Sequence, residues 1–397
     1  MLKLFQINVV ANQGSTGKIA EQIGRLAINK GWCCYLAYGR GNPSSNLELI
    51  RIGNDFEIKW HALQTRILDN HGLASRAATK QLIKKIESIQ PDIIHLHNLH
   101  GYYLNYRILF EFLAKYGKPI VWTLHDCWAF TGHCAFFDFN KCDKWKTHCK
   151  NCPSKHSYPS SFFFDRSQGN YDEKRLSFSL PDNLTLVPVS EWLNGLHRDS
   201  FLNKIPSRVI HNRVDLDVFA GYCTPRQRTT YNIISVANNW SEPRKGFKDF
   251  LLLRERLPSE FIITLVGLKD KEVKQLPKGI IGITRTSNQK ELASLYANAD
   301  VFVLPTYEDN FPSVILESLA SGTPVIVYNT GGCSEAVNHQ VGMIVPQGDI
   351  DALIDAIMKM RKSPISSAVC RSWAESHFKN EDCFNAYFDL YNDLLSK

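Results

Sequence analysis

One stretch, residues 300–327, constrains the fold of this chain more than any other. It reads DVFVLPTYEDNFPSVILESLASGTPVIV, and its short apolar runs at Val301–Leu304 and Pro324–Val327 predict strands that are buried on both faces. Pro312 suits the first turn of a helix between them, and Gly322 suits the end of that helix. Buried strands joined by a helix predict a parallel α/β sheet, with the helix beginning at the carboxyl edge of the sheet.

The loop before this helix carries acidic side chains at the edge where open α/β sheets bind ligands. A helix N-terminus there offers unpaired N–H groups and a partial positive charge, which suit a phosphate. Glu317 lies one turn beyond Ser313 on the same helix face, and Asp309 stands eight positions before Glu317. Carboxylates beside an anion site favour a ligand with both phosphate and hydroxyl groups, such as a nucleotide-sugar. The alternative is an ordinary acidic surface turn.

The same segment resembles a known family. Asp309 and Glu317 enclose seven residues, and ESLASGTPVIV follows, a pattern that resembles the E-x7-E signature of family 4 retaining glycosyltransferases with the GT-B fold. The chain departs from the signature where Asp309 replaces its first Glu, although Glu308 stands next to it. The resemblance implies a donor-binding segment, which consists of Glu308, Asp309, Asn310, Phe311, Ser313 and Glu317.

Length and composition fit two globular domains. The 397 residues are too many for one core of ordinary size, and 44% hydrophobic and 21% charged residues are typical of a globular chain. The net charge of +7 suits an anionic substrate or membrane surface but is too weak to favour nucleic acid. Gln6 and Asn8 interrupt the first apolar run, which predicts a strand and not a secretory signal. No apolar stretch reaches the ~18 residues that would span a bilayer, so we expect a cytoplasmic protein.

A glycine-rich turn follows the first predicted strand. Gly14 to Lys18 (GSTGK) invites a P-loop interpretation, but Asn12 and Ile19 occupy two of the four positions that the motif fixes. What remains is a loop at a helix N-terminus, and it resembles the glycine loop of family 4 glycosyltransferases. We therefore predict that Gly14 and Ser15 approach a donor phosphate or sugar; a tight βα turn is the alternative.

Histidines gather after two predicted strands of the first half. His95 and His97 alternate along the strand that ends at Leu96, so they share one face, and His100 follows them. They form either a metal pair or, as we favour, a hydrogen-bonding rim in which His97 and His100 face the acceptor. The strand KPIVWTLHD ends at His125. The resemblance implies that His125 contacts the transferred sugar, and the alternative is a histidine held by the next residue, Asp126.

The segment 127–160 is irregular and rich in cysteine, with five of the eleven cysteines between positions 127 and 152. A loop of some thirty residues without a clear helix or strand needs something to offset its ordering entropy. A structural zinc ion would do so, with His133 or His148 able to replace one thiolate. Buried free thiols are the alternative, and disulfides are disfavoured in a cytosolic chain. The predicted metal ligands are Cys134, Cys142, Cys149 and Cys152. The segment 127–160 also resembles that of a Cys-rich subgroup of family 4, whose members come from bacterial gene clusters of the capsule, exopolysaccharide and colanic acid type.

The second half opens with a strand followed by PRKGF, in which Arg244 and Lys245 are adjacent. Two cations at the carboxyl end of a strand can neutralise a diphosphate. PRKGF resembles the diphosphate-binding segment of the family, although the Arg that commonly precedes it is replaced around Asn239. A solvated basic turn is the alternative.

Strands and helices alternate twice over, which predicts two doubly wound, Rossmann-like domains. The resemblance implies that these domains face a cleft, as in the GT-B fold. We predict an acceptor-side domain over residues 1–210, with the insertion at 127–160, and a donor-binding domain over residues 211–377. The final helix, 378–397, is expected to pack back on the first domain.

The resemblance implies a retaining glycosyltransferase that moves a hexose-type sugar from a UDP-, GDP- or ADP-linked donor to a lipid-linked glycan acceptor in bacterial surface polysaccharide synthesis. Lys245, Asp309 and His125 would be catalytic, and no catalytic metal is expected. Peripheral contact with the inner face of the plasma membrane would follow, with no nucleic acid bound. The alternatives are a GT-B nucleotide-sugar epimerase or phosphorylase-like enzyme, and a non-catalytic zinc-containing protein that binds sugar or nucleic acid.

Overall fold

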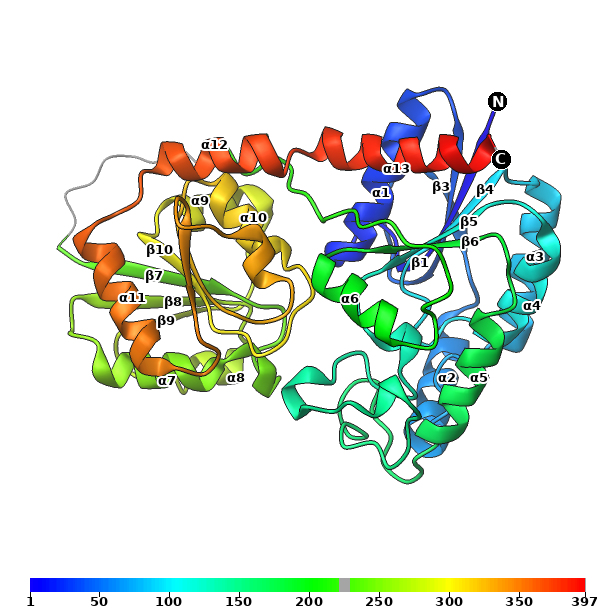
Figure 1. The fold of residues 1–397 in the computed structure, drawn as a ribbon. Coiled ribbons are helices and arrows are strands. Elements are labelled where there is room, and N and C mark those ends of the chain that lie inside the picture. The colour runs from blue at the N-terminus through cyan, green and yellow to red at the C-terminus, as the bar shows by residue number, and fades with distance from the viewer. Residues whose placement is uncertain (221–228, 397) are drawn as a thin grey trace. The chain divides into compact units, whose positions relative to one another are not determined.

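The computed structural model describes residues 1–220 and 229–396, and the chain divides into two units. Unit 1 comprises Met1–His211 and Phe384–Lys397, and unit 2 comprises Asn212–Cys383. Each unit is built on a six-stranded parallel sheet flanked by helices (Figure 1). The predicted pair of doubly wound α/β domains is confirmed.

The sheet of unit 1 has the strand order β3-β2-β1-β4-β5-β6. The chain runs outward from β1 to β3 and then returns to the other side of β1 with β4. This reversal creates a topological switch point between β1 and β4, the place where doubly wound sheets bind ligands. The strands are β1 (Lys3–Val10), β2 (Cys33–Arg40), β3 (Glu48–Arg51), β4 (Ile93–Leu96), β5 (Ile120–Leu124) and β6 (Leu184–Pro188).

The described part of unit 1 contains seven helices, the last of which, α13, begins in unit 2 and lies mainly in unit 1. Ser190 caps α6 as its position suggests, because its hydroxyl accepts the N–H of Leu193 at 3.1 Å. The Cys-rich insertion contains only three-residue 3-10 turns: η1 (Trp128–Phe130), η2 (Asp138–Asn140) and η3 (Lys144–Lys146). The helices are α1 (Gly14–Asn29), α2 (Asp55–Leu68), α3 (Arg76–Ile89), α4 (Tyr106–Tyr116), α5 (Ser167–Phe178), α6 (Glu191–Asp199) and α13 (Asn380–Leu395).

The sheet of unit 2 has the order β12-β11-β10-β7-β8-β9, which puts its switch point between β7 and β10. Its strands are β7 (Tyr231–Val236), β8 (Phe261–Val266), β9 (Ile280–Ile283), β10 (Val301–Leu304), β11 (Val325–Tyr328) and β12 (Gly342–Val345). Its helices are α7 (Phe247–Arg256), α8 (Asp270–Val273), α9 (Gln289–Ala297), α10 (Ser313–Ala320), α11 (Ile350–Lys362) and α12 (Ser367–His377), with 3-10 turns η4 (Pro243–Lys245) and η5 (Cys333–Ala336).

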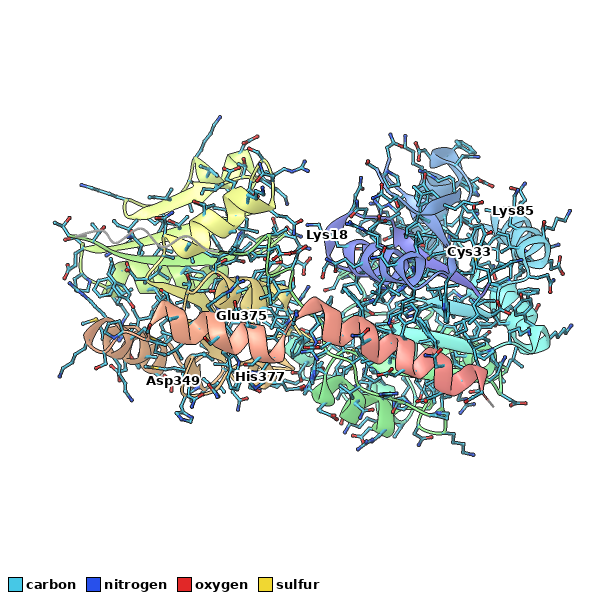
Figure 2. The ribbon with its side chains drawn as sticks, turned by 90° about the horizontal axis from the view of Figure 1, so that it is seen from above. Lys18, Cys33, Lys85, Asp349, Glu375 and His377 are labelled. Carbon is cyan, nitrogen blue, oxygen red and sulfur yellow. The ribbon has the colours of Figure 1, made fainter. Side chains whose placement is uncertain are left out.

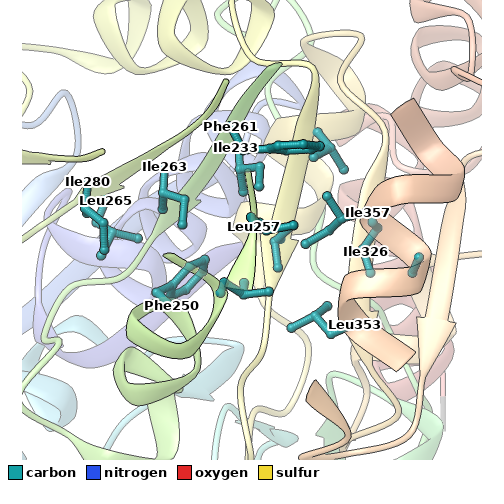
Figure 3. Packing of buried hydrophobic residues seen from close by; sticks show 14 of the residues in the cluster. Ile233, Phe250, Leu257, Phe261, Ile263, Leu265, Ile280, Ile326, Leu353 and Ile357 are labelled. Carbon is teal, nitrogen blue, oxygen red and sulfur yellow. The ribbon is translucent and has the colours of Figure 1, made fainter. Parts of the chain in front are cut away.

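The core of unit 2 lies between its sheet and the helices α7 and α11 (Figure 3). Ile233 and Ile263 project from the sheet, Phe250 from α7, and Leu353 and Ile357 from α11, and all five are fully buried. Each such side chain contributes about 1.5–3 kcal/mol on burial. A core of this kind holds the strand ends, and therefore the loops that follow them, in fixed positions.

The last helix, α13, packs on the sheet of unit 1, as predicted. Its Tyr391 hydroxyl lies 2.7 Å from His95 Nδ1 on β4, and its Tyr387 hydroxyl lies 2.9 Å from Thr123 Oγ1 on β5. The ring of Phe388 contacts Trp32 with 5.1 Å between centroids. Polar contacts as well as apolar ones therefore fix the helix.

Two helices differ from the sequence prediction. The helix predicted to open at Pro312 begins at Ser313, with Pro312 as its N-cap. Helix α2 was not predicted. No helix in the described ranges has both the length and the apolar character to cross a bilayer.

Candidate active site

Three loops meet at the switch point of unit 2 because the strands before them are neighbours. η4 follows β7, the loop 305–311 follows β10, and a Gly331-Gly332 turn follows β11. The first two loops are joined by hydrogen bonds: Tyr307 N–H donates to Arg244 O at 2.7 Å, and Arg244 Nη1 donates to Glu308 O at 2.8 Å. The predicted diphosphate-binding and acidic segments therefore form one structure.

Two glycines allow this close approach. Gly246 has φ +75°, and a Cβ there would lie 2.1 Å from Pro305 O. Gly331 has φ +53°, and a Cβ would lie 1.9 Å from Asp309 O. A larger residue at either position would push the loops apart and would also occupy a left-handed backbone conformation.

The Lys245 ammonium and the Asp309 carboxylate form an ion pair, with Nζ and Oδ2 2.5 Å apart. Their side chains are 12% and 19% exposed, so both can still be reached. Burial disfavours the ionised carboxyl, but the charges of Lys245 and Arg244 outweigh it and lower the pKa of Asp309. Glu308 is only 1% exposed, so Asp309 is the one of these two acids that a ligand can reach.

Glu317 lies on the first turns of α10 and accepts two hydrogen bonds. Ser313 Oγ donates to its Oε1 at 3.2 Å, as the shared helix face predicted, and Tyr296 OH donates to its Oε2 at 3.3 Å. These contacts orient the carboxylate beside the N-terminus of α10. The Glu317 carboxylate can accept hydrogen bonds from ligand hydroxyls at this position. The free N–H groups at the start of α10 favour an anion.

In unit 1, the predicted glycine loop follows β1. Gly14 is the first residue of α1, has φ +62° and has open space where a Cβ would stand. Ser15 is exposed beside it, and Lys18 lies within the first turns of α1 (Figure 2). No acidic residue occupies the first turn of α1, so this helix end can receive an anion.

A hydrogen-bonded chain runs from Gln6 through His97 to His125. Gln6 Oε1 lies 3.1 Å from His97 Nε2, and His97 Nδ1 lies 3.3 Å from His125 Nε2. Gln6 uses its Nε2 to donate to Ala20 O at 2.8 Å, which turns its carbonyl toward His97. These partners assign the proton of His97 to Nε2, so that His97 accepts at Nδ1 from His125 Nε2–H.

His97 and His125 in this hydrogen-bonded chain are neutral at pH 7. Burial lowers the pKa of His125 to about 4, against the opposing effect of Asp126, and burial holds the pKa of His97 well below its usual value. A neutral imidazole can donate and accept hydrogen bonds but brings no charge to a ligand. His125 therefore suits contact with a sugar hydroxyl better than contact with a phosphate.

His100 has its own partners. Its Nε2 lies 2.7 Å from Asp126 Oδ2, and its Nδ1 lies 2.8 Å from Tyr158 OH. His97 is 1% exposed and His100 is 8% exposed, with both ring nitrogens of each in hydrogen bonds. The geometry therefore favours a positioning role for both over direct contact with an acceptor.

The four predicted metal ligands, Cys134, Cys142, Cys149 and Cys152, are free thiols and line one small cavity of about 10 Å³ together with His133. His133 Nδ1 lies 2.6 Å from Asp69 Oδ1, whereas its Nε2 is buried without a hydrogen-bond partner. His148 is paired with Asp172 at 3.0 Å. No group of three or more His, Cys, Asp or Glu side chains in the described ranges is arranged to hold a metal ion.

Sequence reasoning missed several residues that support these sites. Gln6, Tyr296 and Asp69 contact His97, Glu317 and His133, respectively, from elements distant in the sequence. Only Gln6 gave a signal, as a polar residue at a buried position of an apolar strand.

Comparisons with known proteins agree with this architecture. Residues 35–218 match the model of Glycosyltransferase Family 4, and residues 230–363 match that of Glycosyl transferases group 1. These matches cover most of the chain, in both units. The protein is therefore a glycosyltransferase with the GT-B fold, and its first half is similar to Family 4 over residues 35–218.

Several individual proteins match this chain over nearly its full length. A protein of Escherichia coli (strain K12) named as the colanic acid biosynthesis glycosyl transferase WcaC is 25% identical over 425 aligned positions, which cover 99% of this chain and 100% of WcaC. Sucrose-phosphate synthase from Thermosynechococcus elongatus superposes with a TM-score of 0.74 at 16% identity, covering 100% of both chains. HepE of Anabaena, solved in complex with UDP, gives 0.66 at 14% identity, covering 99% of this chain and 100% of HepE.

Proposed function

We propose that the protein transfers a hexose-type sugar, with retention of configuration, from a nucleotide-diphosphate donor to a growing glycan of the bacterial surface. The observation that carries this proposal is the Lys245–Asp309 pair with Arg244 at the switch point of unit 2. The names of the relatives support it, since WcaC is named for colanic acid synthesis and HepE was solved with UDP.

The proposed roles follow from the chemistry of each side chain. Arg244 and Lys245 would stabilise the charge that develops on the leaving diphosphate, with help from the backbone N–H groups around Asn310–Ser313. Glu317 would accept hydrogen bonds from the ribose hydroxyls. Asp309, and His125 of unit 1, would contact the transferred sugar.

The donor would be a UDP-, GDP- or ADP-sugar, and we expect no catalytic metal. Two cationic side chains within one loop supply the positive charge that a divalent ion brings in other transferases. Gly14 and Ser15 would lie close to the donor at the N-terminus of α1.

We further propose a lipid-linked glycan acceptor and a cytoplasmic protein that contacts the inner face of the plasma membrane. The similarity to WcaC supports an acceptor of this kind, because colanic acid, for which WcaC is named, is a polymer of the cell surface.

We propose a structural zinc ion as the stabilising group of the Cys-rich insertion. The four cysteines and His133 line one cavity, the Nε2 of His133 is buried without a hydrogen-bond partner, and Asp69 holds the other nitrogen of that ring, as carboxylates do behind metal-bound histidines. The thiolates would have to move closer together than they stand here. His133 would be a fifth candidate donor around a tetrahedral ion.

Metal analysis of protein purified without a histidine tag tests this idea. We expect about one equivalent of zinc, and its loss together with lower thermal stability in Cys142→Ser. Cys33→Ser, which changes a thiol outside the insertion, is the matched control. Less than a tenth of an equivalent of zinc or iron in the wild-type protein would contradict the proposal.

A donor panel tests the proposed function itself. Purified protein is incubated with UDP-, GDP- and ADP-sugars and lipid-linked acceptors, and the products are read by mass spectrometry. We expect transfer from one nucleotide class. Failure of every donor in both hydrolysis and transfer, without nucleotide binding, would refute the proposal, and an altered free sugar released with no acceptor would favour an epimerase.

A further inference from the structure

Helix α2 carries an apolar stripe that faces solvent. Phe56, Trp60, Leu63 and Ile67 follow one another at intervals of four, three and four residues, so they lie along one face of the helix. All four are exposed, Phe56 at 76% and Trp60 at 53%. The residues that α2 buries lie on its other side. The helix is therefore amphipathic, with its more apolar face outward.

A second apolar segment adjoins the end of this stripe. Phe162, Phe163 and Phe164 are three consecutive exposed aromatic residues, of which Phe163 is 72% exposed. The N–H of Phe162 donates to Arg66 O on the last turn of α2 at 2.8 Å. Segments about a hundred positions apart in the sequence thus lie side by side, as Figure 1 shows for α2 and the insertion.

Hydrogen bonds on both sides of residues 162–164 fix the backbone of this aromatic segment. Ser161 Oγ donates to Phe164 O at 2.7 Å, and the N–H of Arg166 donates to Asp69 Oδ2 at 2.8 Å. Asp69 is itself the C-cap of α2 and is fully buried. The aromatic run is therefore tied at both ends to α2, and a contiguous exposed apolar surface on a fixed backbone marks an interaction site.

The charges around this surface favour an anionic partner. Lys59 and Arg66 are exposed on one border of the stripe, and neither has an ion-pair partner in the described part of the chain. The acids of α2 are already engaged: Asp55 pairs with Arg51, and Glu57 accepts the N–H of Asn54 in a capping box. Aromatic and aliphatic side chains bordered by Lys and Arg are typical of helices that lie in a membrane interface.

We propose that this surface docks unit 1 on an anionic lipid bilayer. We call it the α2 docking surface; it consists of Phe56, Trp60, Leu63, Ile67, Phe162, Phe163 and Phe164, with Lys59 and Arg66 at its border. The apolar side chains enter the interface, and the two cations contact lipid headgroups. The inference rests on the proposed function, because it assigns the proposed membrane contact to named residues and would bring the enzyme to a lipid-linked acceptor.

Co-sedimentation with vesicles tests the proposal on the full-length protein. Vesicles of phosphatidylcholine with phosphatidylglycerol should bind the wild-type protein, and vesicles of phosphatidylcholine alone should bind it at least tenfold less. The variant Phe56→Ser/Phe163→Ser should lose at least tenfold in binding to the anionic vesicles. Lys59→Glu/Arg66→Glu should lose the preference for anionic lipid.

The matched control is Leu252→Ser/Met358→Ser, which removes two exposed apolar side chains of unit 2 and should bind vesicles as the wild type does. Equal binding by the Phe56→Ser/Phe163→Ser variant, or no binding by the wild type to anionic vesicles, overturns the proposal. So does a dimer in gel filtration that this variant dissociates, because a second copy of the chain would then cover the surface. Nucleotide binding, measured on the same samples, separates failure of docking from failure of the proposed function.

Discussion

The two units use one topology to build two different chemical environments. At the switch point of unit 1, Gln6, His97 and His125 form a neutral, hydrogen-bonded chain. At the switch point of unit 2, Lys245 and Asp309 form an ion pair with Arg244 beside them. The fold therefore sets the position of each site, and the side chains after its strands set the chemistry of that site. The proposed function assigns the diphosphate to the cations of unit 2 and an uncharged sugar to the histidines of unit 1.

The largest effect is expected from Lys245→Ala. Loss of this cation removes charge stabilisation from the leaving diphosphate and leaves Asp309 without its partner, so we expect a 100- to 1000-fold lower transfer rate. Lys248→Ala, three positions later and exposed on α7, should leave the rate unchanged. Steady-state rates with the accepted donor measure both. A Lys245→Ala rate within twofold of wild type would remove diphosphate binding from that residue.

A smaller effect, a loss of nucleotide affinity, is expected from Gly331→Ala. This substitution disturbs the site without removing a charged side chain. The added Cβ would overlap Asp309 O, and the left-handed backbone would be strained, so we expect about tenfold weaker nucleotide binding. Gly169→Ala in α5 is the control, because the new Cβ would have no atom from outside its own helical backbone within 4 Å. Equal dissociation constants for wild type and Gly331→Ala would show that the turn does not position Asp309.

The two units should also differ in acid stability. Burial lowers the pKa of His61 and His95 to about 3 and that of His125 to about 4, so the unfolded chain binds more protons below pH 6.5. The contribution of these neutral histidines to the free energy of unfolding is complete above about pH 6.5. It falls by up to about 1.4 kcal/mol per pH unit and per histidine as the pH decreases. Asp309 has a lowered carboxyl pKa, so its contribution is lost only below about pH 4.

Hydrogen exchange read by mass spectrometry, corrected for the intrinsic rate, reports each unit within the intact chain. Between pH 7 and pH 5, peptides of β4 and β5 should lose protection, whereas peptides of β10 and β11 should keep it. Equal losses in both units would contradict the contrast between neutral and ionised sites.

The smallest effect concerns the helix that supports the neutral site. Tyr391→Phe leaves His95 Nδ1 without the hydroxyl, which should lower the protection of α13 by about 1–2 kcal/mol. Tyr35→Phe, whose hydroxyl has no hydrogen bond among the described residues, should change it by less than about 0.5 kcal/mol. Unchanged exchange of α13 in Tyr391→Phe would mean that apolar packing alone holds the helix.

The same contrast explains what the sequence could predict. The segments PRKGF and TYEDNFPS follow short buried strands, so their place at one sheet edge followed from the strand pattern alone. The partners of His97 and His133 were not predictable in this way, because Gln6 and Asp69 reach them from residues 91 and 64 positions away. Local patterns determine which element a residue occupies, but they do not determine which distant side chain it meets.

Helix α2 was not predicted, although its apolar positions have the spacing that indicates a helix. That spacing does not show which face meets the core. The stripe faces solvent, and the side chains that the helix buries include His61 and Thr65.

The proposed function requires that unit 2 binds the diphosphate through Lys245. The most direct test measures, by titration calorimetry, the dissociation constants of a nucleoside diphosphate and its monophosphate for the base that binds best. Wild type and Lys248→Ala should bind the diphosphate at least tenfold more tightly than the monophosphate, and Lys245→Ala should lose this difference. An unchanged preference for the diphosphate in Lys245→Ala would contradict the claim.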